Sequence, residues 1–300
     1  MSYLYSFLQI IVQGISVGGV YALVALGFVL IYKATKVINF AQGHLLLLGA
    51  YLYFFFAVEL SLNPLLAIAA SSIVAACVGF SIERFLLRKM LGEPLLSVMM
   101  LTLALTYIIR GIVQIFWGGQ YLALGDKSVF PSGAITIGSV KLGYAYAGGL
   151  LTSLAVVGLF TIFFLKTRTG VAMRAVANDQ RAAFAVGINV FRIFALSWAI
   201  SSVVAVLGGV VFANIFGGVN INFESVGIKV FPAVIIGGLD SLPGAIVGGF
   251  LLGILESVAK LYLNPILGGN FHEVFPLLVM LAVLLVKPYG LFGTEEIERL

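Results

Sequence analysis

Apolar stretches long enough to cross a lipid bilayer recur along the whole chain, and they constrain its fold more than any other feature. A helix needs roughly 20 mostly apolar residues to span the hydrocarbon core. Of the 300 residues, 61% are hydrophobic and only 10% are charged, whereas a typical soluble domain has about 25% charged residues. The composition therefore excludes a soluble protein and predicts an all-α, polytopic transmembrane helical bundle.

We expect about eight to nine membrane segments in a single transmembrane domain that covers residues 1–300. Their approximate positions are 7–32, 43–58, 64–87, 94–117, 144–165, 193–216, 226–239, 243–262 and 274–286. Segments 43–58 and 226–239 are short for a complete span. The N-terminus lacks the basic region of a cleaved signal, so it is interpreted as the start of the first span.

The basic residues predict the orientation of the bundle. Lys33, Lys36, Arg84, Arg88 and Lys287 all fall on one side if every segment crosses the membrane. Loops rich in lysine and arginine remain in the cytoplasm, so this side is expected to be cytoplasmic and the N-terminus external. The loop at 118–143 is then external, and it either contacts a partner outside the membrane or simply connects two helices.

Residues 166–192 form a long polar stretch between two apolar segments, and they are expected to fold as a helical elbow. Asn178 and Asp179 are natural helix N-caps, so two short helices should meet at this pair. Gly170 before the first helix and Gly187 after the second are expected to bound the elbow.

The elbow carries five basic residues and a single acid, which suits a docking surface for a cytoplasmic partner. An ordinary basic loop that follows the positive-inside rule explains the same composition. The candidate docking residues are Arg174, Asn178, Asp179, Arg181 and Gly187.

Two short polar motifs, at 37–43 and 219–225, resemble each other, and each precedes a short apolar segment. In the expected topology one motif approaches from the cytoplasm and the other from outside. This relationship predicts an inverted repeat whose broken or re-entrant helices form a transport site near the midplane. A chance match and a capped interfacial turn are the alternatives. The candidates for the translocation pathway are Asn39, Phe40, Gln42, Gly43, His44, Asn222 and Glu224.

Further charged residues within the apolar segments have less specific interpretations. Glu224 and Lys229 either pair beside a pathway or lie at the outer interface. Arg110 is close enough to the outer end of its segment to snorkel. Glu256 and Lys260 have the spacing of a local helix pair.

The chain has 35 glycines, which predict close contacts between membrane helices, because small residues let helix backbones approach. The packing candidates are Gly19, Gly208, Gly237, Gly238, Gly244 and Gly248. A compact bundle, or contact with a partner subunit, is expected rather than a wide pore.

Motifs for hydrolytic chemistry are absent from the sequence, as is the phosphate-binding loop of ATPases. A single cysteine and two separated histidines offer no disulfide framework or metal site. The chain is therefore not expected to be an enzyme or to bind a cofactor, and any ATP would be bound by another subunit.

Several ordered blocks of residues give the chain a close resemblance to the permease subunits of branched-chain amino-acid ABC importers, over nearly its whole length. The blocks are Gly19-Val20-Tyr21-Ala22-Leu23, Val37-Ile38-Asn39-Phe40-Ala41-Gln42-Gly43, Met173-Arg174-Ala175 with Asn178-Asp179, Gly237-Gly238-Leu239-Asp240-Ser241-Leu242-Pro243-Gly244-Ala245, and Lys287-Pro288-Tyr289-Gly290-Leu291-Phe292-Gly293.

The resemblance implies a subunit of the inner membrane that passes branched-chain or other hydrophobic amino acids inward. Its partners would be a second homologous permease, two cytoplasmic ATP-binding subunits and an external solute-binding protein. The elbow would be the coupling helix that contacts the ATP-binding subunits.

Two residues depart from the family pattern. His44 stands where an acidic residue is frequent, and Asp240 replaces a small uncharged one. Either could reflect another solute, since urea and amide importers share much of the pattern. A stand-alone secondary carrier or channel is a further alternative, although no convincing ion-coupling residue lies within the segments.

Overall fold

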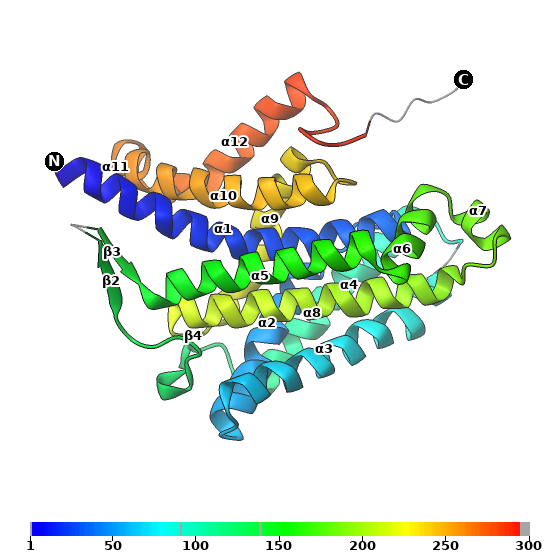
Figure 1. Ribbon diagram of the computed structural model, residues 1–300, viewed down its shortest axis with the longest axis horizontal. Helices are drawn as coiled ribbons and strands as arrows, with labels where there is room; N and C mark the ends of the chain where they lie inside the picture. The colour runs from blue at the N-terminus through cyan, green and yellow to red at the C-terminus, as the bar shows by residue number, and fades with distance from the viewer. Residues whose placement is uncertain (1, 91, 138–139, 295–300) are drawn as a thin grey trace.

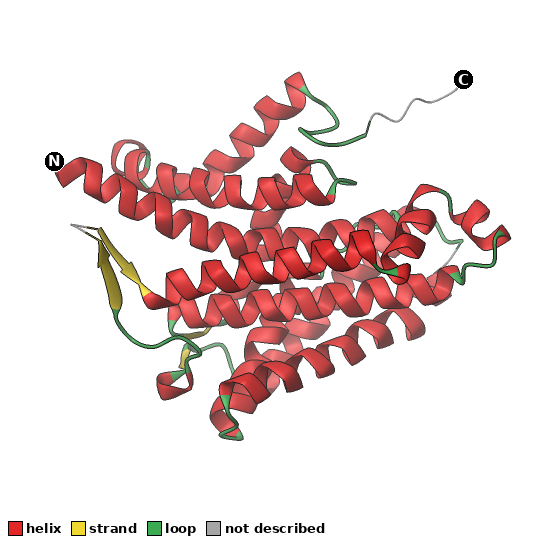
Figure 2. Ribbon diagram, viewed as in Figure 1, coloured by secondary structure: helices red, strands yellow, loops and turns green. Residues whose placement is uncertain are grey.

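Most of the chain is helical, and the long helices lie side by side (Figures 1 and 2). The computed structural model describes residues 2–90, 92–137 and 140–294. Its helices are α1 (Ser2–Thr35), α2 (Gln42–Phe54), the π-helix η1 (Phe55–Glu59), α3 (Pro64–Phe85), η2 (Leu87–Met90), α4 (Leu95–Trp117), η3 (Gly125–Lys127), α5 (Tyr144–Lys166), α6 (Arg168–Asn178), α7 (Gln180–Ala185), α8 (Val190–Phe216), η4 (Ile221–Glu224), α9 (Ser225–Gly237), α10 (Leu242–Tyr262), α11 (Asn264–Leu267) and α12 (Phe271–Val286). Its strands are β1 (Leu122–Ala123), β2 (Ala134–Ile137), β3 (Val140–Gly143) and β4 (Gly218–Val219).

The predicted all-α transmembrane bundle is confirmed. Within the described residues, seven helices are long and apolar enough to cross a membrane. One of these is α2, which reaches 18 residues because η1 continues it without a break. The other two expected segments are the shorter helices α9, of 13 residues, and α12, of 16 residues.

Helix α1 lies at the centre of the bundle, where it packs against α10, α8, α5 and α9. Glycines form its crossing with α10: a Cβ on Gly253 would overlap the backbone of Gly14 and Gly18. Such contact between backbones requires small residues on both helices.

Glycines also allow close backbone contact where α9 crosses α10. The backbones of Gly237 and Gly244 touch, and a Cβ on Gly248 would overlap the carbonyl of Ala233. These three glycines are therefore placed where the sequence interpretation needs them.

The remaining packing candidates differ from one another. Gly19 faces Ser153 of α5, and Gly238, with φ of +107°, lies against the backbone of Gly293. The packing around Gly208 does not require a glycine, because a Cβ at this position would make only ordinary contacts, the nearest at 3.7 Å.

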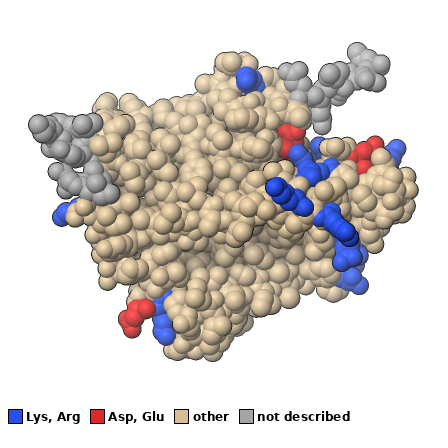
Figure 3. Space-filling model, in the orientation of Figure 1, with Lys and Arg blue, Asp and Glu red and all other residues tan. Residues whose placement is uncertain are grey.

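The two ends of the bundle differ in character. At one end lie the strands, with β1 paired to β4 and β2 to β3. At the other end lie α6 and α7, and most of the lysines and arginines visible in Figure 3 gather there. This charge asymmetry matches the expected orientation, with the strand end outside.

Candidate transport site and partner interface

Helices α2 and α9 meet with their amino-terminal ends in contact. The backbones of Gly43 and Gly227 are so close that a Cβ on either would overlap the other residue, and Gly43 also touches the carbonyl of Glu224. Each helix follows a non-helical segment, 36–41 before α2 and 217–220 before η4 and α9. The two motifs that resemble each other in sequence thus lie together in space.

The two half-helices run toward opposite ends of the bundle. Near the far end of α2, the Tyr53 hydroxyl donates to the carbonyl of Lys127 in the outer loop (2.6 Å). At the far end of α9, the carbonyl of Ile236 accepts from the amide of Leu291 (2.8 Å), in the tail that follows α12. Broken helices that face each other in this way are the arrangement that an inverted repeat produces around a transport site.

Asn39 and Gln42 are buried within the bundle, where they shape the start of α2. The Asn39 side chain donates to Gln42 Oε1 (3.1 Å) and accepts from the amide of Ala41 (3.0 Å). The Ser201 hydroxyl of α8 lies 3.0 Å from Gln42 Oε1 and 2.8 Å from the carbonyl of Gly27. These amides therefore tie the start of α2 to α1 and α8.

Phe40 and Asn222 occupy different environments. The Phe40 ring stacks on Phe231 of α9, with centroids 5.4 Å apart, and its amide donates to the Thr102 hydroxyl of α4 (3.4 Å). Asn222 is exposed, and its amide donates to the side chain of Asn220 (2.8 Å).

A charged cluster lies where the two half-helices meet. Glu224 Oε1 is 2.6 Å from Arg110 Nη1, and Glu224 Oε2 is 3.3 Å from His44 Nε2. Arg110 lies in the second half of α4 and pairs with Glu224, a contact that its interpretation as a snorkelling residue does not include. The sequence analysis did not predict that Arg110 would pair with Glu224, although a charged residue within a membrane span is itself a signal of function.

Lys229 does not pair with Glu224. Its ammonium lies 3.0 Å from Glu256 Oε1 and 3.1 Å from Glu273 Oε1. Glu256 also accepts from the hydroxyl of Tyr21 (2.5 Å). The carboxylate of Glu256 thus connects α1 and α9. Within the described residues, Glu256 forms no ion pair with Lys260, so the expected local pair is wrong.

The elbow consists of two short helices, α6 and α7, as the sequence predicts. Asp179 caps α7, since its carboxylate accepts from the amides of Arg181 (2.8 Å) and Ala182 (3.0 Å). Gly187 follows α7 with φ of +87°, a conformation that favours glycine. The predicted position of Gly170 before the first helix is wrong, because Gly170 lies inside α6, packed against the backbone at the end of α5.

The arginines of the elbow have different surroundings. Arg174 donates to the carbonyls of Phe164 and Leu165 and lies over the Phe164 ring. It therefore joins α6 to the carboxyl end of α5, where a cation is favourable. Arg181 is exposed, as is Asn178.

Two large apolar side chains on the elbow are also exposed. Phe184 is 65% exposed and Val186 is 77% exposed, at the basic end of the molecule. Exposed apolar groups on a polar segment outside the membrane are typical of a protein interface.

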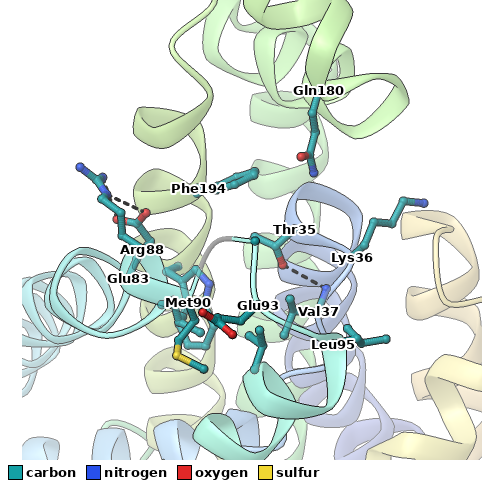
Figure 4. A pocket seen from close by; sticks show the side chains of 14 residues that line it. Thr35, Lys36, Val37, Glu83, Arg88, Met90, Glu93, Leu95, Gln180 and Phe194 are labelled. Carbon is teal, nitrogen blue, oxygen red and sulfur yellow. Dashed lines mark hydrogen bonds and ion pairs between the residues drawn. The ribbon is translucent and has the colours of Figure 1, made fainter.

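A cavity of about 210 Å³ lies between the elbow and the ends of α1 and α3 (Figure 4). Gln180 of α7 extends over it and donates to the carbonyl of Ala34 at the end of α1 (3.2 Å). On the opposite wall, Arg88 pairs with Glu83, which is only 2% exposed (2.9 Å). Gln180 thus connects the elbow to the segment that leads into α2.

Asp240, one of the two departures from the family pattern, lies far from the cluster at Glu224. Its carbonyl accepts from the ammonium of Lys33 (2.9 Å), and its carboxylate accepts from the amide of Thr294 (3.3 Å). It joins the turn between α9 and α10 to the C-terminal tail.

A sequence profile described as the permease component of the branched-chain amino acid transport system matches residues 10–284. The chain belongs to this family. As a member of this permease family with seven apolar helices of spanning length, it is a multi-pass protein of the inner membrane.

The chain is also similar to individual permeases over nearly its full length. The chain is 31% identical to the high-affinity branched-chain amino acid transport system permease protein LivH of Escherichia coli, covering 98% of this chain and 97% of LivH. It is 30% identical to the corresponding permease protein BraD of Pseudomonas aeruginosa, covering 100% of both chains.

A chain of PsaBC from Streptococcus pneumoniae, solved in complex with Fab, aligns with a TM-score of 0.47 at 16% identity and covers 93% of this permease and 89% of that chain.

Proposed function

We propose that this permease is the membrane-spanning subunit of an ABC importer that carries branched-chain or other hydrophobic amino acids into the cytoplasm. The observation that carries the proposal is the match to branched-chain amino-acid permeases over nearly the full length of the chain. ATP is bound and hydrolysed by two partner subunits, a second permease completes the pathway, and an external binding protein delivers the solute.

The elbow supports the proposed coupling to the ATP-binding subunits. Exposed Phe184, Val186 and Arg181 give the basic end of the molecule a mixed apolar and cationic surface. Gln180 joins the same elbow to the end of α1, and only six residues, 36–41, separate α1 from α2. A displacement of the elbow by the ATP-binding subunits would therefore reach the meeting point of α2 and α9.

Uptake by the reconstituted complex tests the function. Liposomes containing both permeases and both ATP-binding subunits, supplied with the binding protein, are expected to accumulate labelled leucine only with ATP. Isoleucine and valine should compete, whereas urea and acetamide should not. Transport of urea would favour the related importer class, and gradient-driven leucine flux by this chain alone would contradict the assignment.

Replacing the exposed aromatic residue of α7 tests the docking surface. Phe184→Ala is expected to weaken association of the ATP-binding subunits by about ten-fold, since exposed aromatic residues at interfaces frequently contribute more than 1 kcal/mol. Ile73→Ala is the matched control, because Ile73 is also 65% exposed but lies on α3 in the membrane. Equal recovery of the ATP-binding subunits with both variants in pull-down measurements would contradict the docking role.

A further inference from the structure

Arg110 occupies a position that lipid cannot cover at low cost. It lies in the second half of the membrane helix α4, and its side chain is 43% exposed in the isolated subunit. A guanidinium in hydrocarbon is strongly unfavourable, so such residues face protein or a water-filled path. Gln114, one turn farther along α4, is exposed as well. The part of α4 around Arg110 and Gln114 is therefore expected to face protein or water rather than lipid.

Glu224 brings Arg110 to the amino-terminal ends of the two half-helices. It immediately precedes α9, and its carbonyl contacts Gly43 at the start of α2. The amino end of a helix carries a partial positive charge that stabilises anions. The guanidinium of Arg110 pairs with the carboxylate of Glu224, which remains 17% exposed, and the backbone of Glu224 lies between the two helix ends.

The pair presents one cation and one anion side by side, which matches the head group of an amino-acid zwitterion. Breaking a partly buried ion pair is costly when one charge loses its partner. A zwitterion avoids this loss, because its carboxylate can bind the guanidinium while its ammonium binds the released carboxylate. Both protein charges remain paired, and the net charge of the site does not change.

We propose that the Arg110–Glu224 ion pair opens to bind the zwitterionic head of the transported amino acid. Arg110 and the amino ends of α2 and α9 receive the α-carboxylate, and Glu224 receives the α-ammonium. His44 Nε2 lies 3.3 Å from the second oxygen of Glu224, and this oxygen accepts no hydrogen bond within the described residues, so it can receive the ammonium. This assignment rests on the proposed function as an amino-acid permease.

Uptake measurements on the complete transporter in proteoliposomes test the assignment. Arg110→Gln and Glu224→Gln are each expected to lower leucine uptake per ATP hydrolysed by about ten-fold or more, since each removes a charge-assisted bond to the solute. Arg110→Lys keeps the cation and should retain a larger share of uptake. The control is Arg84→Gln, at an exposed arginine near the end of α3 and outside the cluster, with uptake expected to stay within about two-fold.

A charge swap distinguishes solute binding by the Arg110–Glu224 pair from a purely structural role of this ion pair. The double variant Arg110→Glu, Glu224→Arg keeps an ion pair but exchanges the sites for the carboxylate and the ammonium. We expect it to assemble and hydrolyse ATP without restoring uptake. Restored uptake would overturn the proposal, because pairing alone would then be sufficient, and so would unchanged uptake in both glutamine variants.

Measurements on the wild-type transporter separate failure of the proposed function from failure of the binding assignment. Absence of leucine uptake by the intact wild-type complex would contradict the proposed function itself. Wild-type uptake together with insensitive Arg110 and Glu224 variants would contradict the binding assignment alone. If the glutamine variants fail to assemble while the charge-swapped double variant assembles and transports like the wild type, the pair only stabilises the fold and the binding assignment is overturned.

Discussion

At the scale of single residues, the contact between Gly43 and Gly227 sets the geometry of the transport site. A methyl group at Gly43 would overlap backbone atoms of Gly227 and Glu224, and backbone cannot move aside as a flexible side chain can. Gly43→Ala is therefore expected to destabilise the subunit by about 1–3 kcal/mol, the usual cost of overpacking. Thermal unfolding in detergent measures this change.

A matched glycine provides the comparison. Gly158 of α5 has no atom within 4 Å of the position that a Cβ would take. Gly158→Ala should therefore leave the unfolding temperature unchanged or raise it slightly. Equal effects of the two substitutions would show that the close contact of α2 and α9 is not present in the folded protein.

At the scale of elements, the elbow is connected to the transport site through the end of α1. Gln180→Ala removes the hydrogen bond to the carbonyl of Ala34 and keeps the exposed Phe184 of α7. We expect the ATP-binding subunits to remain associated, while leucine uptake per ATP hydrolysed falls several-fold because displacement of the elbow is transmitted less rigidly. The ratio of uptake to phosphate release measures this coupling.

Gln120→Ala, at an exposed site of the loop after α4, serves as the control for that experiment. A coupling ratio that is the same for Gln180→Ala, Gln120→Ala and the wild type would exclude the bond to Ala34 as a link in transmission.

At the scale of the whole molecule, the charge asymmetry predicts that the elbow is cytoplasmic and the strand end external. Cys77 is the only cysteine in the sequence, so Cys77→Ser provides a background for site-specific labelling. In intact cells, an impermeant maleimide should label a cysteine introduced by Gln120→Cys but not one introduced by Arg181→Cys. Labelling of the elbow from outside would contradict both the orientation and the proposed coupling.

The sequence by itself determined the class of fold, the membrane segments and the two-helix elbow. In a bilayer the backbone must satisfy its hydrogen bonds within each segment, so apolar length alone predicts a helix. The elbow also depends on interactions between residues close in sequence, because Asp179 caps α7 by accepting from the amides of Arg181 and Ala182. The resemblance between residues 37–43 and 219–225 even indicated which segments would meet.

Only the tertiary structure decided which charges pair and which glycines are needed. Arg110 and Glu224 are 114 residues apart in the chain, and Lys229 is nearer to Glu224 in sequence yet pairs with Glu256 and Glu273. Gly208 looks like the other packing glycines in sequence but touches nothing closely. These outcomes depend on how the helices cross and rotate against one another, and that packing joins distant parts of the chain that no local pattern records.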